Sequence, residues 1–205
     1  MKKNRHTNAT IIVLCLVISV LALAKSDVTA FFQDPERIIL QAKPHEKDPI
    51  EIDDVMVRGK AVRFGEKFND DDLWLRDITF KVTNKYSKPI TYVQINIDFP
   101  EVLYNGVMMQ HQMFLGRHPV FDKPASSKPV RIMPSESLKA SLDKEYDGIK
   151  KAITFVDSSR ISLIGKITLR LSEVGFEDGT VYSGGSMFRR NPDPNASSKW
   201  LKIIE

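Results

Sequence analysis

The fold is decided by residues 74–99, which read WLRDITFKVTNKYSKPITYVQINIDF. Apolar residues occupy every second position from Ile78 to Val82 and again from Val93 to Phe99, and a polar break at 84–89 lies between the two runs. Strict alternation is typical of a β-strand with one buried face and one wet face. Because the break is short and contains Ser87 and Pro89, we expect the halves to form an antiparallel pair. The inward residues would be Ile78, Phe80, Val82, Val93, Ile95, Ile97 and Phe99.

Further strands are predicted on both sides of this pair. Residues 50–64 resemble a first strand with a kink or bulge near Gly59. Downstream, we expect Pro100 to end the second strand of the pair, and strands to follow at 107–114, 138–142 and 160–171. Val174 and Phe176 lie on the opposite parity from Leu171, which predicts a bulge near Ser172-Glu173. Asp178-Gly179 predicts a type I′ hairpin turn with Phe176 opposite Val181.

One segment has a helical period. Leu142, Tyr146, Ile149 and Ile153 follow at intervals of four, three and four, so they share one helical face. We expect a short helix that crosses between two sheets. In the strand predicted at 160–171, Leu163, Ile167 and Leu169 would face the central strands. About seven strands, one helix and no repeated βαβ unit predict an all-β, immunoglobulin-like antiparallel sandwich over residues 51–205.

The N-terminal residues have the three parts of a secretory signal. Lys2, Lys3 and Arg5 precede an uncharged run of 16 residues, 9–24, which ends in Ala22-Leu23-Ala24. This pattern predicts a signal peptide over 1–24, with an uncleaved membrane anchor as the alternative. Cys15, the only cysteine, lies within the run, so disulfides cannot hold the body together. We expect export across the inner membrane to a bacterial periplasm or exterior.

Residues 25–50 are predicted to be a linker. Within them, 37–42 suit a short strand or a helical turn, and 43–49 (KPHEKDP) are polar with two prolines.

The charge of the chain is concentrated at its N-terminus. The net charge is +4, and the first 24 residues supply three basic residues and no acidic one, so the body carries about +1. A body so nearly neutral has no electrostatic footprint for nucleic acid, and we expect no nucleic-acid partner.

Four segments form a recognisable pattern: 80–84 (FKVTN), 87–90 (SKPI), 93–97 (VQINI) and 134–137 (PSES). A strand that ends in Asn, a small turn, a paired strand and a Pro-Ser-Glu before another strand resemble the FxLYD-type bacterial extracytoplasmic sandwich. The resemblance covers about residues 74–142. It implies an immunoglobulin-like domain with a binding or accessory role, and it implies no catalytic residue.

Metal chemistry has two candidate segments. Asn69-Asp70-Asp71-Asp72 clusters the oxygens that calcium prefers, but it lacks the spacing of an EF-hand loop, which favours a solvated loop. Met108, Met109, His111, Met113 and His118 offer thioether and imidazole ligands, which suit copper. On a strand Met109, His111 and Met113 would share one face, so a periplasmic copper site is the alternative to core packing.

Motifs for catalysis are missing from the sequence. No serine lies in a Gly-x-Ser-x-Gly elbow, no His/Cys set has zinc spacing, and no Gly-rich phosphate loop occurs. We therefore expect a non-enzymatic module without a cofactor, which binds an envelope protein or a cell-surface component. An open sheet edge, or exposed aromatics such as Tyr92 and Tyr104, would supply the contact. The sequence does not set the oligomeric state.

Overall fold

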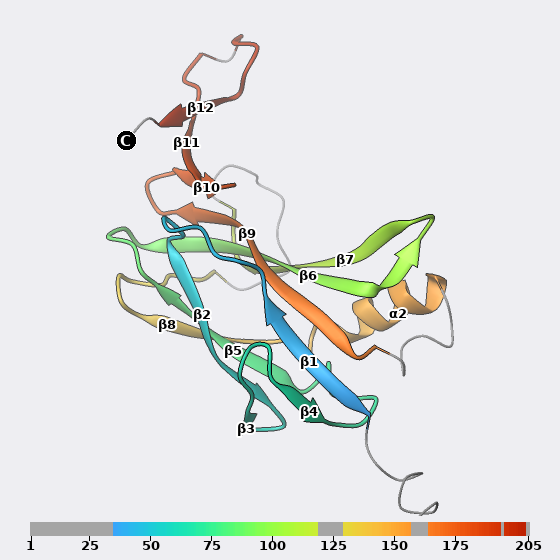
Figure 1. Ribbon diagram of the computed structural model, residues 1–205. Coiled ribbons are helices and arrows are strands. Elements are labelled where there is room, and N and C mark those ends of the chain that lie inside the picture. The colour runs from blue at the N-terminus through green and yellow to red at the C-terminus, as the bar shows by residue number, and fades with distance from the viewer. Residues whose placement is uncertain (1–34, 119–128, 157–163, 194, 204–205) are drawn as a thin grey trace, which may run out of the picture. The chain divides into compact units, whose positions relative to one another are not determined.

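Two β-sheets enclose one hydrophobic core in the computed structural model, which describes residues 35–118, 129–156, 164–193 and 195–203 (Figure 1). One helix, α2 (Tyr146–Val156), lies in this described part. The all-β sandwich with a short helix is thus confirmed. The chain divides into Met1–Pro35 and Glu36–Glu205, and all strands belong to the second unit. The predicted signal or anchor at 1–24 lies outside the described residues.

The larger sheet is built around β9 (Lys166–Phe176). β6 (Ile90–Tyr104) pairs along one side of β9, and β7 (Val107–Gly116) pairs with β6. On the other side of β9, β1 (Glu36–Gln41) runs parallel to it, where an entirely antiparallel arrangement was expected. The sheet is completed by four short strands: β4 (Lys67–Asn69), β10 (Val181–Ser183), β11 (Ser186–Arg190) and β12 (Trp200–Ile203).

The smaller sheet has four strands in the order β3-β2-β5-β8. β2 (Ile50–Val57) has a bulge at Asp54-Val55, where its register with β5 shifts. The kink predicted near Gly59 is instead a turn, because Arg58 and Gly59 have positive φ angles and connect β2 to β3. β5 is Ile78–Asn84, β8 is Ser137–Ser141 and β3 is Lys60–Ala61. The described residues hold twelve strands where about seven were expected, because strands of two to six residues leave almost no periodic pattern.

The predicted antiparallel pair of β5 and β6 is wrong. β5 pairs with β2 and β8 in the smaller sheet, whereas β6 pairs with β7 and β9 in the larger one. The inward residues of both strands are buried in the same core, so the two strands face each other across the sandwich. Leu169 pairs with Ile97 of β6 in the same sheet, Ile167 pairs with Ile39 of β1, and Leu163 lies outside the described residues. Alternation shows which face of a strand is buried. The same pattern arises whether two strands pair in one sheet or face each other across the core, so it does not identify the partner.

Asn84 makes the connection between the sheets. Its buried side chain donates from Nδ2 to the carbonyls of Lys88 and Ile132, both at 2.9 Å, and its Oδ1 accepts from the Tyr86 amide at 2.9 Å. These bonds satisfy backbone groups that would otherwise be unpaired where the chain leaves one sheet for the other. The turn at 85–89 is thus an arch between layers and not a hairpin.

The C-terminal half of the larger sheet follows the predictions in part. Leu171 pairs with Ile95 and Glu173 pairs with Gln94, so Ser172 is the predicted bulge, and Val174 and Phe176 are both buried. The Asp178-Gly179 hairpin is present, but only Gly179 has a positive φ, 82°, and Val181 lies opposite Gly175. A type I′ turn needs two positive φ angles. The loop therefore has three residues, and the amide of Phe176 donates to Thr180.

The helix prediction is confirmed. Leu142, Tyr146, Ile149 and Ile153 are all buried, and α2 leads from β8 of the smaller sheet toward β9 of the larger one. Within the segment 25–50, predicted to be a linker, Glu36–Gln41 instead forms β1, as the alternative of a short strand expected. Residues 160–163 of the predicted strand lie outside the described residues.

Candidate functional site: an apolar hairpin tip beside α2

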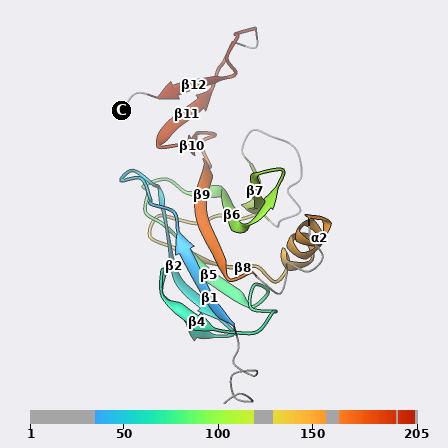
Figure 2. The same cartoon turned by 45° about the vertical axis from the view of Figure 1, so that its right-hand side comes forward.

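The end of the β6–β7 hairpin is a two-residue turn at Asn105-Gly106. Asn105 has φ 50° and Gly106 has φ 79°, as a type I′ turn requires. Figure 1 and Figure 2 both show this end of the hairpin beside α2. Pro100 does not end the strand as predicted, since β6 continues to Tyr104.

Pro100 instead marks the bulge that shapes the tip. Phe99 pairs with Met109 but Leu103 pairs with Met108, so residues 100–102 have no partners on β7. Proline has no amide to donate and is tolerated at such a bulge. Val102 is buried in the core, and the Glu101 carboxylate accepts from the amides of Gly165 and Lys166 at 2.7 and 3.1 Å. The bulge is thereby fixed to the start of β9, and residues beyond it form the tip.

A groove of about 790 Å³ runs between the hairpin tip and α2. On the helix it is lined by Gly148, Lys151, Ala152 and Phe155, and by Val156, which also packs against the core. Gly148 has no side chain and Ala152 has only a methyl group, so few side-chain atoms project from the helix where it faces the hairpin. The rings of Tyr104 and Phe155 meet at one end of the groove, with centroids 6.1 Å apart.

Five large apolar side chains are exposed on the hairpin tip and on α2, and we call them the tip surface. Four of them line the groove, and the fifth, Leu103, pairs with Met108. Their exposed fractions range from 40% to 79%, and they are Leu103, Tyr104, Val107, Met108 and Phe155. Exposed apolar residues scattered singly are ordinary, whereas a group gathered around a groove is typical of an interaction site. Tyr104 is exposed, as expected, and its role as a contact residue stays a prediction.

Sequence reasoning missed the other members of the tip surface. The signal for the hairpin was present, since Asn105-Gly106 is a strong turn dipeptide. Phe155 also stands two residues after the buried Ile153, so on a helix it falls off the buried face. The groove itself could not be predicted, because it requires the bulge at 100–102 to place the tip beside α2.

Lys151 supplies a positive charge to the groove. It is exposed, and it has no ion-pair partner within the part of the chain that the structure describes. A ligand of the groove would therefore meet an apolar surface with one unneutralised cation at its side.

The residues of the copper alternative lie along β7. Met109, His111 and Met113 share the face of β7 that packs inward. Met113 is buried in the core, Met109 packs against it, and His111 Nε2 lies 2.9 Å from Glu145 Oε2. No group of three or more His, Cys, Asp or Glu in the described ranges could hold a metal ion. Copper binding through the thioethers stays a prediction.

His118 and Tyr92 lie at the other end of β7. His118 Nε2 is 2.8 Å from Glu173 Oε1, and its ring meets the edge of Tyr92 at 4.8 Å. Phe114 stacks on the same tyrosine at 6.3 Å. Tyr92 is therefore buried, and the prediction that it is an exposed contact residue is wrong.

The burial of Tyr92 predicts a loss of stability at alkaline pH. Desolvation, with a smaller contribution from the Glu173 carboxylate, raises the pKa of the Tyr92 hydroxyl to about 12, whereas an unfolded chain has about 10. Between these values the folded state keeps a proton that the unfolded state releases, so this contribution is complete below pH 10 and declines toward pH 12. We expect a loss of up to about 2 kcal/mol over this window.

Urea unfolding at stepped pH would measure this loss. Tyr92→Phe should lose less stability than the wild type between about pH 10 and 12. Equal losses in the two proteins would contradict the assignment to Tyr92.

The acidic loop 69–72, considered above for calcium, forms ion pairs with two arginines of the chain, Arg37 and Arg58. Arg58 contacts the carboxylates of Asp70, Asp71 and Asp77, and its hydrogen bond lowers the pKa of Asp71. The buried Arg37 lies 3.1 Å from Asp72 and donates to the Asp70 carbonyl. The oxygens that a calcium ion would need are thus engaged by guanidinium groups.

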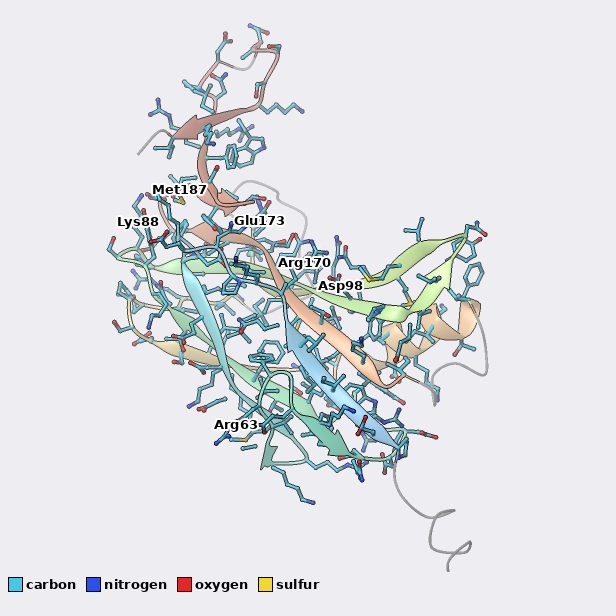
Figure 3. All side chains as sticks on the ribbon, viewed as in Figure 1. Arg63, Lys88, Asp98, Arg170, Glu173 and Met187 are labelled. Carbon is cyan, nitrogen blue, oxygen red and sulfur yellow. The ribbon has the colours of Figure 1, made fainter. Side chains whose placement is uncertain are left out.

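A polar network lies on the outer face of the larger sheet, where β7, β6 and β9 run side by side. Arg170 on β9 makes two hydrogen bonds of 3.1 Å to the buried Asp98 on β6, and Gln110 on β7 donates to the same carboxylate at 2.6 Å (Figure 3). These bonds tie three neighbouring strands together.

A second hollow, of about 750 Å³, lies between residues 46–49 and β10–β12. Tyr182 donates its hydroxyl to Asp48 there, and burial and this carboxylate raise the pKa of the tyrosine above its ordinary value. Tyr182 is therefore a protonated donor at neutral pH, and the contact fixes the 46–49 loop to β10.

No protein-family model, curated protein or solved structure matches this chain. The FxLYD resemblance therefore stays a prediction. Among the described residues, no helix has the length and apolar character that a membrane crossing requires.

Proposed function

We propose that this chain is a non-enzymatic, exported binding module that holds a protein partner at the tip surface. The observation that carries the proposal is the group of five exposed apolar side chains, four of which line the groove. Burying such a group against a partner removes apolar area from water, which is the main favourable term in protein association.

The chemistry of the groove defines the partner. Aromatic rings at one end and Ala152 and Gly148 along the helix favour an apolar segment that lies between hairpin and helix. Lys151 favours a carboxylate at its edge. We therefore assign the groove to an amphipathic protein segment that carries an acidic residue next to its apolar side chains.

The tip surface is supported by regular structure. β6, β7 and α2 position its residues, and Glu101 anchors the bulge beneath it. A surface already formed in the free protein loses little conformational entropy on binding. Export rests on the signal pattern at 1–24, and the accessory role agrees with the FxLYD resemblance.

Site-specific photocrosslinking in living cells tests the proposal. A photoreactive residue replaces Tyr104 in one variant and Phe155 in another. We expect both to give adducts with the same second protein, identified by mass spectrometry, because both rings border one groove. Leu103→Asp, introduced beside either probe, should reduce these adducts at least about tenfold, since a carboxylate replaces a desolvated apolar contact.

Met133 is the matched control position. It is also an exposed large apolar residue, but it follows Ile132, which bridges to Ile90 at the far end of β6 from the tip. The same probe at Met133 should not capture this protein. Capture from all three positions, lipid adducts in place of protein, or no adduct from either tip position would each refute the proposal.

A further inference from the structure

β7 forms one edge of the larger sheet. It pairs with β6, and among the described strands it has no second partner (Figure 1). An edge strand presents a row of backbone donors and acceptors that another strand can use.

This edge lacks the protection that the other edges carry. The other end strands, β3, β4, β8 and β12, have two to five residues, and each contains a lysine. Shortness and lysine both discourage strand addition. β7 has ten residues, VMMQHQMFLG, without Lys, Arg, Asp, Glu or Pro. Among the edge strands that the structure describes, the longest is thus also the one without charge or proline.

The sequence of β7 is nearly palindromic about His111. Reading outward from His111, Gln110 matches Gln112, Met109 matches Met113, and Met108 matches Phe114. A two-fold axis makes the same residues meet in reverse order, so an interface between identical copies must be self-complementary. A palindromic strand meets this requirement in antiparallel register.

The exposure of the side chains agrees with this register. Met108 and Phe114 are 40% and 38% exposed, on the same outer face as Gln110 and Gln112. With the axis at His111, Met108 of one copy would lie opposite Phe114 of the other, and Gln110 opposite Gln112. No like charges would face each other on this outer face, where they would disfavour pairing.

We propose that β7 pairs antiparallel with β7 of a second copy of this chain, across a two-fold axis at His111. The two larger sheets then form one continuous sheet through the dimer. This interface uses the backbone edge of 108–114 and shares Met108 with the tip surface, whereas crosslinks at Tyr104 and Phe155 report on the groove and sedimentation reports on the β7 pairing.

Charge substitution tests the pairing in the full-length chain, purified in detergent so that the apolar run at 9–24 stays dispersed. Gln110→Lys/Gln112→Lys places lysines opposite lysines at the axis. The fold should remain, because both positions are exposed and position 110 lies beside the Asp98 carboxylate. We expect the wild type to sediment as a dimer, and the variant to dissociate at least about 30-fold more readily.

A complementary chain makes the test specific. When the Gln112→Glu variant is mixed with the double-lysine variant, we expect dimers that contain one copy of each. The carboxylate at position 112 of one copy would then face the lysine at position 110 of the other. Lys139→Glu, on the edge strand β8, is the control and should leave the dimer unchanged. A monomeric wild type, or a dimer that persists in the folded double-lysine variant, would overturn the proposal.

Discussion

Arg37→Met will lower the free energy of unfolding by about 3 kcal/mol. The Arg37 side chain is 1% exposed, donates to the Ile164 carbonyl and to the Asp70 carbonyl, and pairs with Asp72. Its guanidinium also lies 5.9 Å from the centre of the buried Trp74 ring. Methionine keeps much of the volume but none of the donors, so buried carbonyls lose partners and the acidic loop loses a cation.

Two controls separate burial from charge. Arg63 is 84% exposed and pairs with Glu66, so Arg63→Met should cost no more than about 0.5 kcal/mol (Figure 3). Asp72 is 59% exposed, so Asp72→Asn should cost less than about 1 kcal/mol. Urea denaturation followed by tryptophan fluorescence would measure all three. If Arg37→Met costs no more than Arg63→Met, the buried network does not stabilise the fold.

Asn84→Ala should destabilise the protein by about 3 kcal/mol. The change removes one buried and two partly buried hydrogen bonds at the arch between the sheets, so the carbonyls of Lys88 and Ile132 and the amide of Tyr86 lose these bonds. Asn191→Ala is a matched control. Asn191 also donates to a carbonyl, of Ser198, and accepts from an amide, of Asp193, but both bonds are exposed.

Asn191→Ala should cost less than about 1 kcal/mol, because water replaces exposed hydrogen bonds. Thermal and urea unfolding of both variants would measure the difference. Equal costs at the two positions would show that the buried arch does not depend on Asn84.

Sequence periodicity predicted elements better than it predicted their partners. The buried face of β5, the buried face of α2 and the bulge at Ser172 all follow from local spacing, because spacing alone decides which side of an element is apolar. The pairing of β5 with β2 and β8 does not follow, because Asn84 looks like an ordinary turn residue until its buried partners are known.

The candidate site could be predicted from the sequence only in small part. Tyr104 could be identified as an exposed aromatic, but Tyr92, at an equivalent outward position, is covered by His118 and Phe114. Likewise, nothing in the local pattern around Arg37 indicates burial, because its partners lie in a loop about 35 residues away and at Ile164. Contacts between distant segments decided both cases.

The parallel pairing of β1 with β9 sets an order of folding. Arg37 and Ile164 lie 127 residues apart, so the first strand of the domain cannot meet this partner until most of the chain is present. Native contacts between such distant segments form slowly. For a chain that is threaded across a membrane N-terminus first, as we propose, β1 would emerge early and would stay without its partner β9 until the rest of the chain had crossed. The domain would then complete its larger sheet only after transport, on the side of the membrane where it functions.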